Sequence, residues 1–246
     1  NLSAPEIALP GDNFNTVLYT GNATTRSITG VGFAPDLVWL KNRDTAGQYH
    51  TLNDTIRGAD KQIYSNTNET ETSDSGVLTA FSSDGFSVGT SSGSNQNTKG
   101  IVAWNWKGDG VSGGTLNEVG TIDSQVNVST TAGFSTVTYT GNGVTGATVG
   151  HSLGVAPDTI WVKQLSGAAG NWRCYFNSLG ANNSIYLSLN EASAGAGNGH
   201  WNNTSPTSTV FTIKADDDIN VSGRDYLAYC WSSIEGYSKV GAYSGN

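Results

Sequence analysis

The chain has 246 residues, of which 36% are hydrophobic and 13% are charged, and its formal net charge is -8. A chain of this length can bury one or two hydrophobic cores. Its negative charge would repel the phosphate backbone of a nucleic acid and an anionic membrane. No stretch reaches the roughly 20 apolar residues of a membrane span, so we expect neither a nucleic-acid partner nor membrane insertion.

Short segments in which apolar and polar residues alternate recur along the chain, separated by Gly, Asn, Asp or Ser. This pattern is typical of half-buried β-strands joined by turns. In the first part of the chain it predicts strands at 15–21, 36–41, 62–66, 85–89 and 101–107. In the second part it predicts strands at 135–141, 158–164, 172–177, 184–190, 210–214 and 226–232. We predict no long helix.

The segments of the first part return in the second part in the same order. "FNTVLYTGN" from Phe14 matches "FSTVTYTGN" from Phe134, and "APDLVWLK" from Ala34 matches "APDTIWVK" from Ala156. The offset is 120 at the first pair, 122 at the second and 125 at the last matching strands. Small loop insertions between two homologous copies explain such a drift, so the sequence indicates an internal duplication.

The duplication predicts an all-β fold of two tandem antiparallel β-sandwich domains, jelly-roll-like in design, with about seven strands each. The glycine of "YTGN", at Gly21 and Gly141, is expected to supply the positive φ of a turn after a strand. The motif returns as "YSGN" at 243–246, which resembles the opening of another copy. The predicted parts are a lead-in strand or connector at 1–13, the first sandwich at 14–110, a linker and lead-in strand at 111–133, the second sandwich at 134–235 and the start of a third, truncated copy at 236–246.

Aromatic residues occupy particular strand faces in both copies. Trp104 and Trp106 share one face of their strand, and Tyr229 and Trp231 repeat that face in the second copy, so we expect it to be core. Another face carries a Trp-x-Lys pair in each copy, Trp39 with Lys41 and Trp161 with Lys163. Along each strand these residues alternate with aliphatic residues that we expect to be buried. This face therefore points outward or toward a neighbouring sheet.

The Trp-x-Lys face is the best candidate for recognition or subunit contact, and packing against a second sheet of the protein itself is the alternative. The loop that contains "GHWNNT" adds a weaker candidate. The binding or interface candidates are Trp39, Lys41, Trp161, Lys163, Trp172 and Trp201. In contrast, Arg57 and Lys61 of "TIRGADK" are expected to be solvated.

No catalytic residue and no cofactor are predicted. The three histidines lack metal-ligand spacing, and no nucleophile elbow or phosphate-binding loop occurs. Asp216 and Asp218, in "ADDDIN", are weak candidates for calcium ligands, because calcium prefers several oxygen ligands; a solvated turn is the alternative.

The two cysteines, Cys174 and Cys230, both lie in the second copy. The offsets match them to Thr51 and Asn105 in the first copy, which therefore lacks both. Joint absence favours a possible disulfide, and two unrelated buried thiols are the alternative.

Blocks such as "SITGVGFAPDLVWLKNR", "TTAGFSTVTYTGNG", "VGHSLGVAPD" and "WNNTSPTSTVF" follow one another in the chain. With these blocks the chain from Phe14 onward resembles a tandem β-domain of unassigned biochemical function in virion and tail-fibre-like proteins of marine bacteriophages, cyanophages included. The resemblance implies a place on the virion surface, an extracellular particle, and other virion proteins as partners. It supplies no catalytic residues.

We therefore expect a non-enzymatic structural virion component, tail-fibre-like or capsid-decorating, that takes part in host-surface adhesion. A host-surface glycan is the expected partner, and analogy with tail fibres predicts a homo-oligomer. The alternatives are a carbohydrate-binding module of a secreted protein and a polysaccharide depolymerase.

Overall fold

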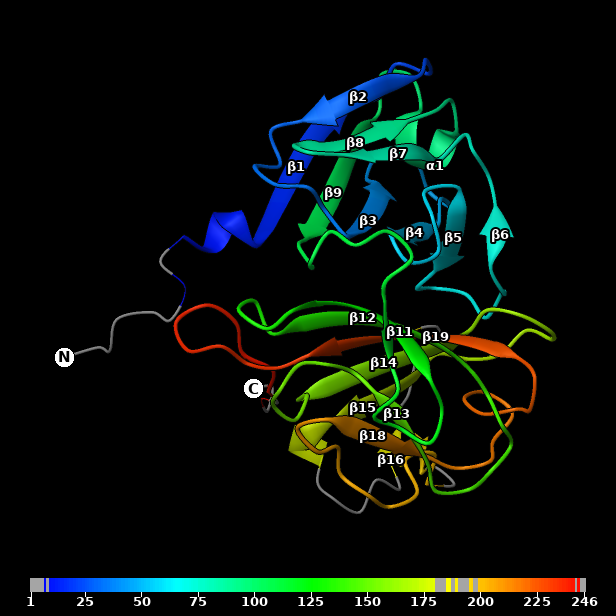
Figure 1. The fold of residues 1–246 in the computed structure, drawn as a ribbon. Coiled ribbons are helices and arrows are strands. Elements are labelled where there is room, and N and C mark those ends of the chain that lie inside the picture. Colours follow the sequence, from blue (N-terminus) through cyan, green and yellow to red (C-terminus); the bar gives the residue numbers. More distant parts are fainter. Residues whose placement is uncertain are drawn as a thin grey trace.

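The computed structural model describes residue 7, residues 9–179, residues 185–186, 189 and 195–196, residues 199–241 and residue 243. Across these residues the chain consists mainly of β-strands and the loops that join them (Figure 1). The first half contains β1 (Phe14–Thr20), β2 (Arg26–Thr29), β3 (Leu37–Asn42), β4 (His50–Asp54), β5 (Lys61–Tyr64), β6 (Thr72–Ser73), β7 (Leu78–Ser82), β8 (Gly85–Val88) and β9 (Gly100–Trp106). The second half contains β10 (Thr115–Asn117), β11 (Ser124–Ser129), β12 (Phe134–Thr140), β13 (Ala147–Gly150), β14 (Thr159–Gln164), β15 (Arg173–Phe176), β16 (Ile185–Tyr186), β17 (Gly195–Ala196), β18 (Val210–Ile213) and β19 (Asp225–Trp231).

Helical structure in the described ranges is short. It comprises η1 (Pro10–Asp12), α1 (Ser92–Asn95) and η2 (Asn177–Leu179). None of these helices has the length and apolar character that crossing a membrane would require.

Each half has a large antiparallel sheet and a small one. Among the described residues, the first half has a six-stranded sheet in the order β1-β9-β3-β4-β5-β6 and a three-stranded sheet in the order β2-β8-β7. The second half has a six-stranded sheet in the order β10-β11-β12-β19-β14-β15, the pair β13-β18 and the short pair β16-β17. The predicted all-β, antiparallel fold class is confirmed.

Four strands of each large sheet correspond in order. The order β1-β9-β3-β4 matches β12-β19-β14-β15, and the pair β2-β8 matches β13-β18. The registers agree as well, because Phe14 lies opposite Trp106 and Phe134 lies opposite Trp231. This correspondence is what the predicted duplication requires.

Each half has its own hydrophobic core between its large and small sheets. Alternate residues of β3, Val38 and Leu40, pack with Ile28 and Phe86 in the first half. In the second half Ile160 and Val162 of β14 occupy the matching places, in a core that also contains Phe211. Since neighbouring side chains of a strand point to opposite faces, the residues between these aliphatic ones face away from the sandwich core.

The "YTGN" motif is explained by close backbone packing. Asn95 is buried at the end of α1, and its side-chain oxygen accepts a hydrogen bond of 3.0 Å from the Asn22 amide. A Cβ atom on Gly21 would overlap the carbonyl oxygen of Gln96. The positive φ of this turn lies at Ala23 (56°) and not at the glycine.

The second copy repeats the arrangement. The buried Asn220 accepts a hydrogen bond of 2.9 Å from the Asn142 amide, and a Cβ atom on Gly141 would overlap the carbonyl oxygen of Val221. Positive φ occurs two residues later, at Gly143 (71°). The expectation that Gly21 and Gly141 supply positive φ is therefore wrong: these positions need glycine because another backbone segment lies against them.

The segments outside the two repeats also differ in structure. The described part of 1–13 contains η1, whereas the second lead-in forms β10 and β11, which extend the large sheet of the second half. Residues 236–241 contain no strand, and Tyr243 is 95% exposed. Most of "YSGN" and of the strand predicted at 184–190 falls outside the described residues.

Candidate functional site at the interface between the halves

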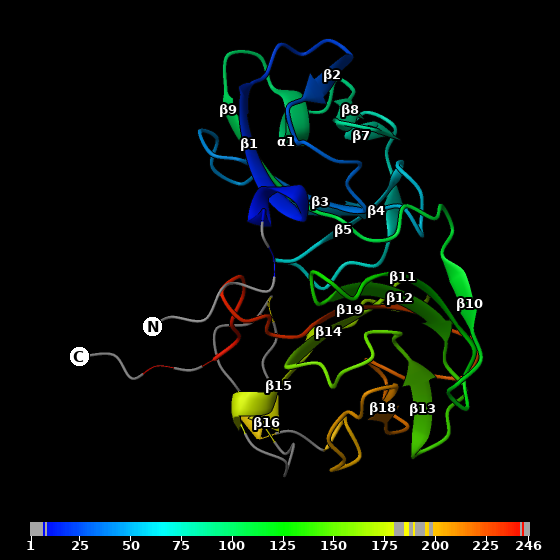
Figure 2. The same cartoon turned by 60° about the vertical axis from the view of Figure 1, so that its left-hand side comes forward.

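The large sheets of the two halves pack face to face, with the small sheets on the outside (Figures 1 and 2). A third hydrophobic cluster fills the space between them, and we call this contact the interface. Its fully buried members are Leu37, Leu52, Ile63, Phe134, Trp172, Leu227 and Tyr229, and its partly buried members are Trp39, Trp106, Trp161, Leu165, Leu189 and Trp231.

The sequence pattern assigned Trp39 and Trp104 to different faces, but in the structure both lie on the same face of the large sheet. Trp39 and Trp104 are directly paired across β3 and β9, and directly paired residues in an antiparallel sheet share a face. The expectation that this face is core holds for Tyr229, which is fully buried, whereas Trp104, Trp106 and Trp231 are partly buried, because the whole face turns toward the other half and not into a sandwich core.

Equivalent residues of the two copies meet across the interface. Trp39 and Trp161 have ring centroids 6.2 Å apart at 84°, and Trp106 and Trp231 have centroids 6.3 Å apart at 64°. Contact between equivalent residues is characteristic of an interface whose two sides are related by a two-fold axis. The Trp-x-Lys face thus packs against a sheet of the protein itself, the sheet of the other half.

An ion network crosses the interface. Arg57 donates to Asp54 (2.7 Å) and to Glu71 (3.2 Å), and its side chain is 3% exposed. Tyr229 of the second half donates its hydroxyl proton to the same Asp54 at 2.9 Å. Burial alone would lower the pKa of Arg57, but the neighbouring Asp54 carboxylate raises it above its ordinary value, so the guanidinium stays charged.

Arg57 is thus a residue that sequence reasoning missed. It was expected to be solvated, yet the turn after β4 folds it back onto Asp54. A single arginine in a polar loop carries no sequence signal for burial, because its partners Glu71 and Tyr229 are distant in the chain. Lys61 is more accessible, with a 38% exposed side chain 3.8 Å from Glu71.

The two lysines of the Trp-x-Lys faces differ. Lys163 is fully buried and donates to three carbonyl oxygens, those of Asn68, Gln164 and Gly170, at 3.0 to 3.3 Å. Burial lowers its pKa to about 8, although Asp218 and Glu69 act in the opposite direction. Lys41 is partly exposed and donates to the Gln48 carbonyl at 2.6 Å. Because Asn68 belongs to the first half, the hydrogen bond from Lys163 to its carbonyl connects the two halves.

The remaining tryptophan candidates are buried. Trp172 is fully buried, and its indole N–H donates to the Tyr64 carbonyl of the first half at 2.9 Å. Trp201 packs between Tyr175 and Phe211 in the core of the second half. Neither side chain faces solvent, which argues against a role for either as a ligand-stacking surface.

The weak calcium candidates are engaged with basic side chains. Asp218 pairs with Arg173, and Asp216 lies 3.1 Å from the His200 ring. Burial raises the pKa of Asp216, but hydrogen bonds from His200 and from the Asp218 amide outweigh it and hold the pKa below its ordinary value. No group of three or more His, Cys, Asp or Glu side chains in the described residues is arranged to hold a metal ion.

The two cysteines are free thiols, so the possible disulfide is not formed. Cys174 is paired with Trp161 and Cys230 with Ile160, on two adjacent residues of β14. Their side chains therefore point to opposite faces of the sheet. The same register matches Cys174 to Leu52 of the first half and not to Thr51, because Leu52 is paired with Trp39.

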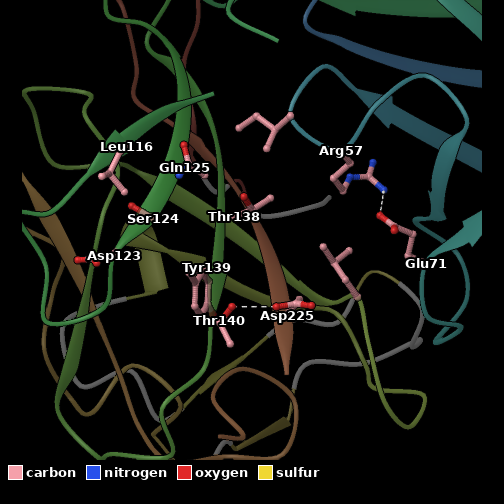
Figure 3. A pocket seen from close by; sticks show the side chains of 12 residues that line it. Arg57, Glu71, Leu116, Asp123, Ser124, Gln125, Thr138, Tyr139, Thr140 and Asp225 are labelled. Atoms are coloured by element: carbon pink, nitrogen blue, oxygen red, sulfur yellow. Dashed lines mark hydrogen bonds and ion pairs between the residues drawn. The ribbon is translucent and has the colours of Figure 1, made fainter. Parts of the chain in front are cut away.

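A polar groove lies at one end of the interface, with a volume of about 380 Å³. Figure 3 shows Arg57 and Glu71 of the first half facing Gln125, Thr138 and Asp225 of the second. Of the carboxylates that line it, Glu71 pairs with Arg57 and Asp225 accepts a hydrogen bond from Thr140, whereas Asp123 is exposed.

An aromatic groove lies at the other end. It consists of two neighbouring depressions of about 320 and 260 Å³, both lined by Trp231 and Ser238. Its aromatic lining comprises Phe14, Trp106, Trp161, Phe176, Trp231 and Tyr237. The two grooves touch opposite ends of β19, at Asp225 and at Trp231, which places them roughly 20 Å apart.

This architecture defines a protein of two antiparallel β-sandwich units joined face to face by a buried aromatic and ionic interface. Residues 9–246 match the model of a family described as a domain of unknown function, DUF7483, and the chain belongs to that family. The match spans both halves and their interface. Searches of curated proteins and of solved structures gave no match.

Proposed function

We propose that this protein is a non-enzymatic structural component of a bacteriophage particle, in a tail fibre or a capsid decoration, and that it takes part in attachment to the host surface. The proposal starts from the resemblance to virion and tail-fibre-like proteins and from the duplicated β-sandwich sequence. A host-surface glycan and other virion proteins are its proposed partners, and a homo-oligomer its proposed assembly.

The interface is the observation that carries the proposal. Two sandwiches that share a hydrophobic cluster and the Asp54–Arg57–Glu71 network behave as one rigid body rather than as two domains on a flexible linker. Flexible domain motion is the default where an interface between domains is small and polar. Rigidity suits a part of a particle that must hold its shape while it presents loops to a cell.

The ionisable groups support a structural role over a catalytic one. Arg57, Asp54 and Tyr229 bond to one another, and Lys163 bonds to backbone carbonyls. In the polar groove Glu71 and Asp225 are already engaged. These contacts indicate that the side chains stabilise the fold.

The test is to locate the chain on particles. An antibody raised against the purified protein should label purified virions of the phage that encodes it, at the tail or on the capsid, in electron micrographs. Peptides of the chain should also occur in the mass spectrum of gradient-purified particles. Their absence from particles, with the protein present in the lysate, would contradict the proposal.

A further inference from the structure

The aromatic groove combines half-exposed rings with a polar rim. Trp161 and Trp231 are both partly exposed, and their ring centroids lie 4.7 Å apart at 58°. Indole rings of an interface are expected to be covered on both faces, because each offers a large apolar area. Here the depressions leave part of this area open, and Thr159, Ser232 and Lys239 border it.

The groove is held in shape by the fold itself. The Trp161 indole N–H donates to the Thr159 hydroxyl at 3.0 Å, and that hydroxyl donates to the Tyr175 carbonyl at 2.8 Å. Trp231 also touches Phe134, with centroids 5.5 Å apart. A preformed site loses less conformational freedom when a ligand binds, so these contacts favour binding.

Ser232 provides a second, independent observation. It lines the groove, it is 4% exposed, and its hydroxyl oxygen has no hydrogen-bond partner in the structure. That oxygen exposes less than 1 Å² to solvent, so a sugar hydroxyl would reach it only after the Ser232 side chain rotates toward the groove. A buried hydroxyl without a partner costs free energy, which that rotation and a bond to the ligand would recover.

Aromatic faces next to hydroxyl and ammonium groups fit one ligand chemistry better than the others. The C–H face of a pyranose ring is apolar and its edge carries hydroxyl groups, so a sugar uses both parts of such a groove. An apolar protein segment would leave Ser232 and Lys239 unused. An anionic membrane surface is disfavoured by the net charge of -8.

We propose that the aromatic groove binds a saccharide, with a pyranose ring stacked on Trp161 and Trp231 and sugar hydroxyls bonded to Ser232 and the rim. The two depressions that share Trp231 and Ser238 accommodate two consecutive rings. This inference rests on the proposed function, since attachment to a host surface is what supplies the saccharide.

A variant that fills the groove tests the inference without removing an interface residue. Gly241 lines the groove, and a Cβ atom there would meet nothing within 4 Å, so the side chain of Gly241→Trp begins in open space at the edge of the groove. The matched control is Val119→Trp, at a 64% exposed residue of the turn after β10, on the side of the polar groove.

The probes are an immobilised array of capsular and lipopolysaccharide oligosaccharides from marine bacteria, together with cellotriose, chitotriose and maltotriose. Wild type and Val119→Trp should bind the same glycan, and Gly241→Trp should bind it at least tenfold more weakly. Titration with that glycan should shift the indole N–H resonances of Trp161 and Trp231 and leave that of Trp104 in place. No bound glycan, or equal binding by Gly241→Trp, would overturn the saccharide site.

A parallel assay separates this inference from the proposed function. Wild type and Gly241→Trp are displayed on streptavidin beads, where multiple copies raise avidity, and mixed with host cells. If both variants bind cells equally and also bind the glycan equally, host attachment stands and the saccharide site is wrong. If glycan binding is lost in Gly241→Trp but the wild type binds no host cells, the site stands, host attachment is contradicted, and a secreted carbohydrate-binding module is favoured.

Discussion

The Tyr229 hydroxyl of β19 donates a hydrogen bond of 2.9 Å to the Asp54 carboxylate at the end of β4, although 175 residues separate the two in the chain. Both side chains are fully buried, and Arg57 donates to the same carboxylate oxygen. One carboxylate of the first half is therefore shared by an arginine of that half and a tyrosine of the second.

Removing the Tyr229 hydroxyl should weaken the protein measurably. Tyr229→Phe leaves a buried carboxylate oxygen without one of its donors, so we expect the free energy of unfolding to fall by about 1–3 kcal/mol. Urea denaturation followed by circular dichroism measures this change. Tyr49→Phe, at a 43% exposed tyrosine, is the control and should change stability by less than about 0.5 kcal/mol.

The Arg57 guanidinium should contribute more than the tyrosine. Arg57→Met leaves the buried Asp54 without its cationic partner and Glu71 with Lys61 alone, and breaking a buried ion pair typically costs about 3–5 kcal/mol. The double variant Asp54→Asn with Arg57→Met should lose less stability than the sum of the two single changes. It removes both charges of the pair, so neither charge is left buried without its partner. Additive losses in denaturation would contradict the network.

Lys163 should make stability rise with pH in the alkaline range. Burial lowers its pKa to about 8 from an ordinary value of 10.5, so between these values the unfolded chain binds more protons than the folded chain. The free energy of unfolding then increases with pH, by about 3 kcal/mol in total. Lys163→Met removes this dependence, so the difference between the two proteins, measured from pH 7 to 10.5, isolates it. A constant difference across this range would refute the lowered pKa.

The two "YTGN" glycines should not tolerate a methyl group. Gly21→Ala and Gly141→Ala each place a Cβ atom against a backbone carbonyl oxygen that cannot move without shifting its own turn. We expect losses of about 1–3 kcal/mol for each. Gly241→Ala, where the added atom meets nothing within 4 Å, serves as the control and should unfold like the wild type.

The two thiols should be unreactive until the protein unfolds. Both cysteines are fully buried, and burial raises the pKa of the Cys230 thiol to about 12 and that of Cys174 above its ordinary value, so little thiolate forms at neutral pH. Ellman's reagent should therefore label two thiols per chain in guanidinium and neither in buffer. Detection of no thiol in guanidinium without reductant would instead indicate a disulfide.

The sequence by itself determined the strand segments and their equivalence between the copies, because period-two alternation and repeated blocks are local properties. It placed Val38 and Leu40 correctly on a buried face. The strands β2, β4, β7 and β13 escaped prediction. Neither "RSIT" nor "ATVG" carries a clear alternation of apolar and polar residues.

The tertiary structure alone decided which faces meet. A strand's periodicity separates its two faces but does not say which face of the neighbouring strand joins them, and the register of β3 against β9 placed Trp39 beside Trp104. Likewise, Arg57 reads as a surface loop residue until folding brings Asp54, Glu71 and Tyr229 around it. Contacts between residues far apart in the chain depend on how the sheets pack, and a single sequence does not encode that packing in any local pattern.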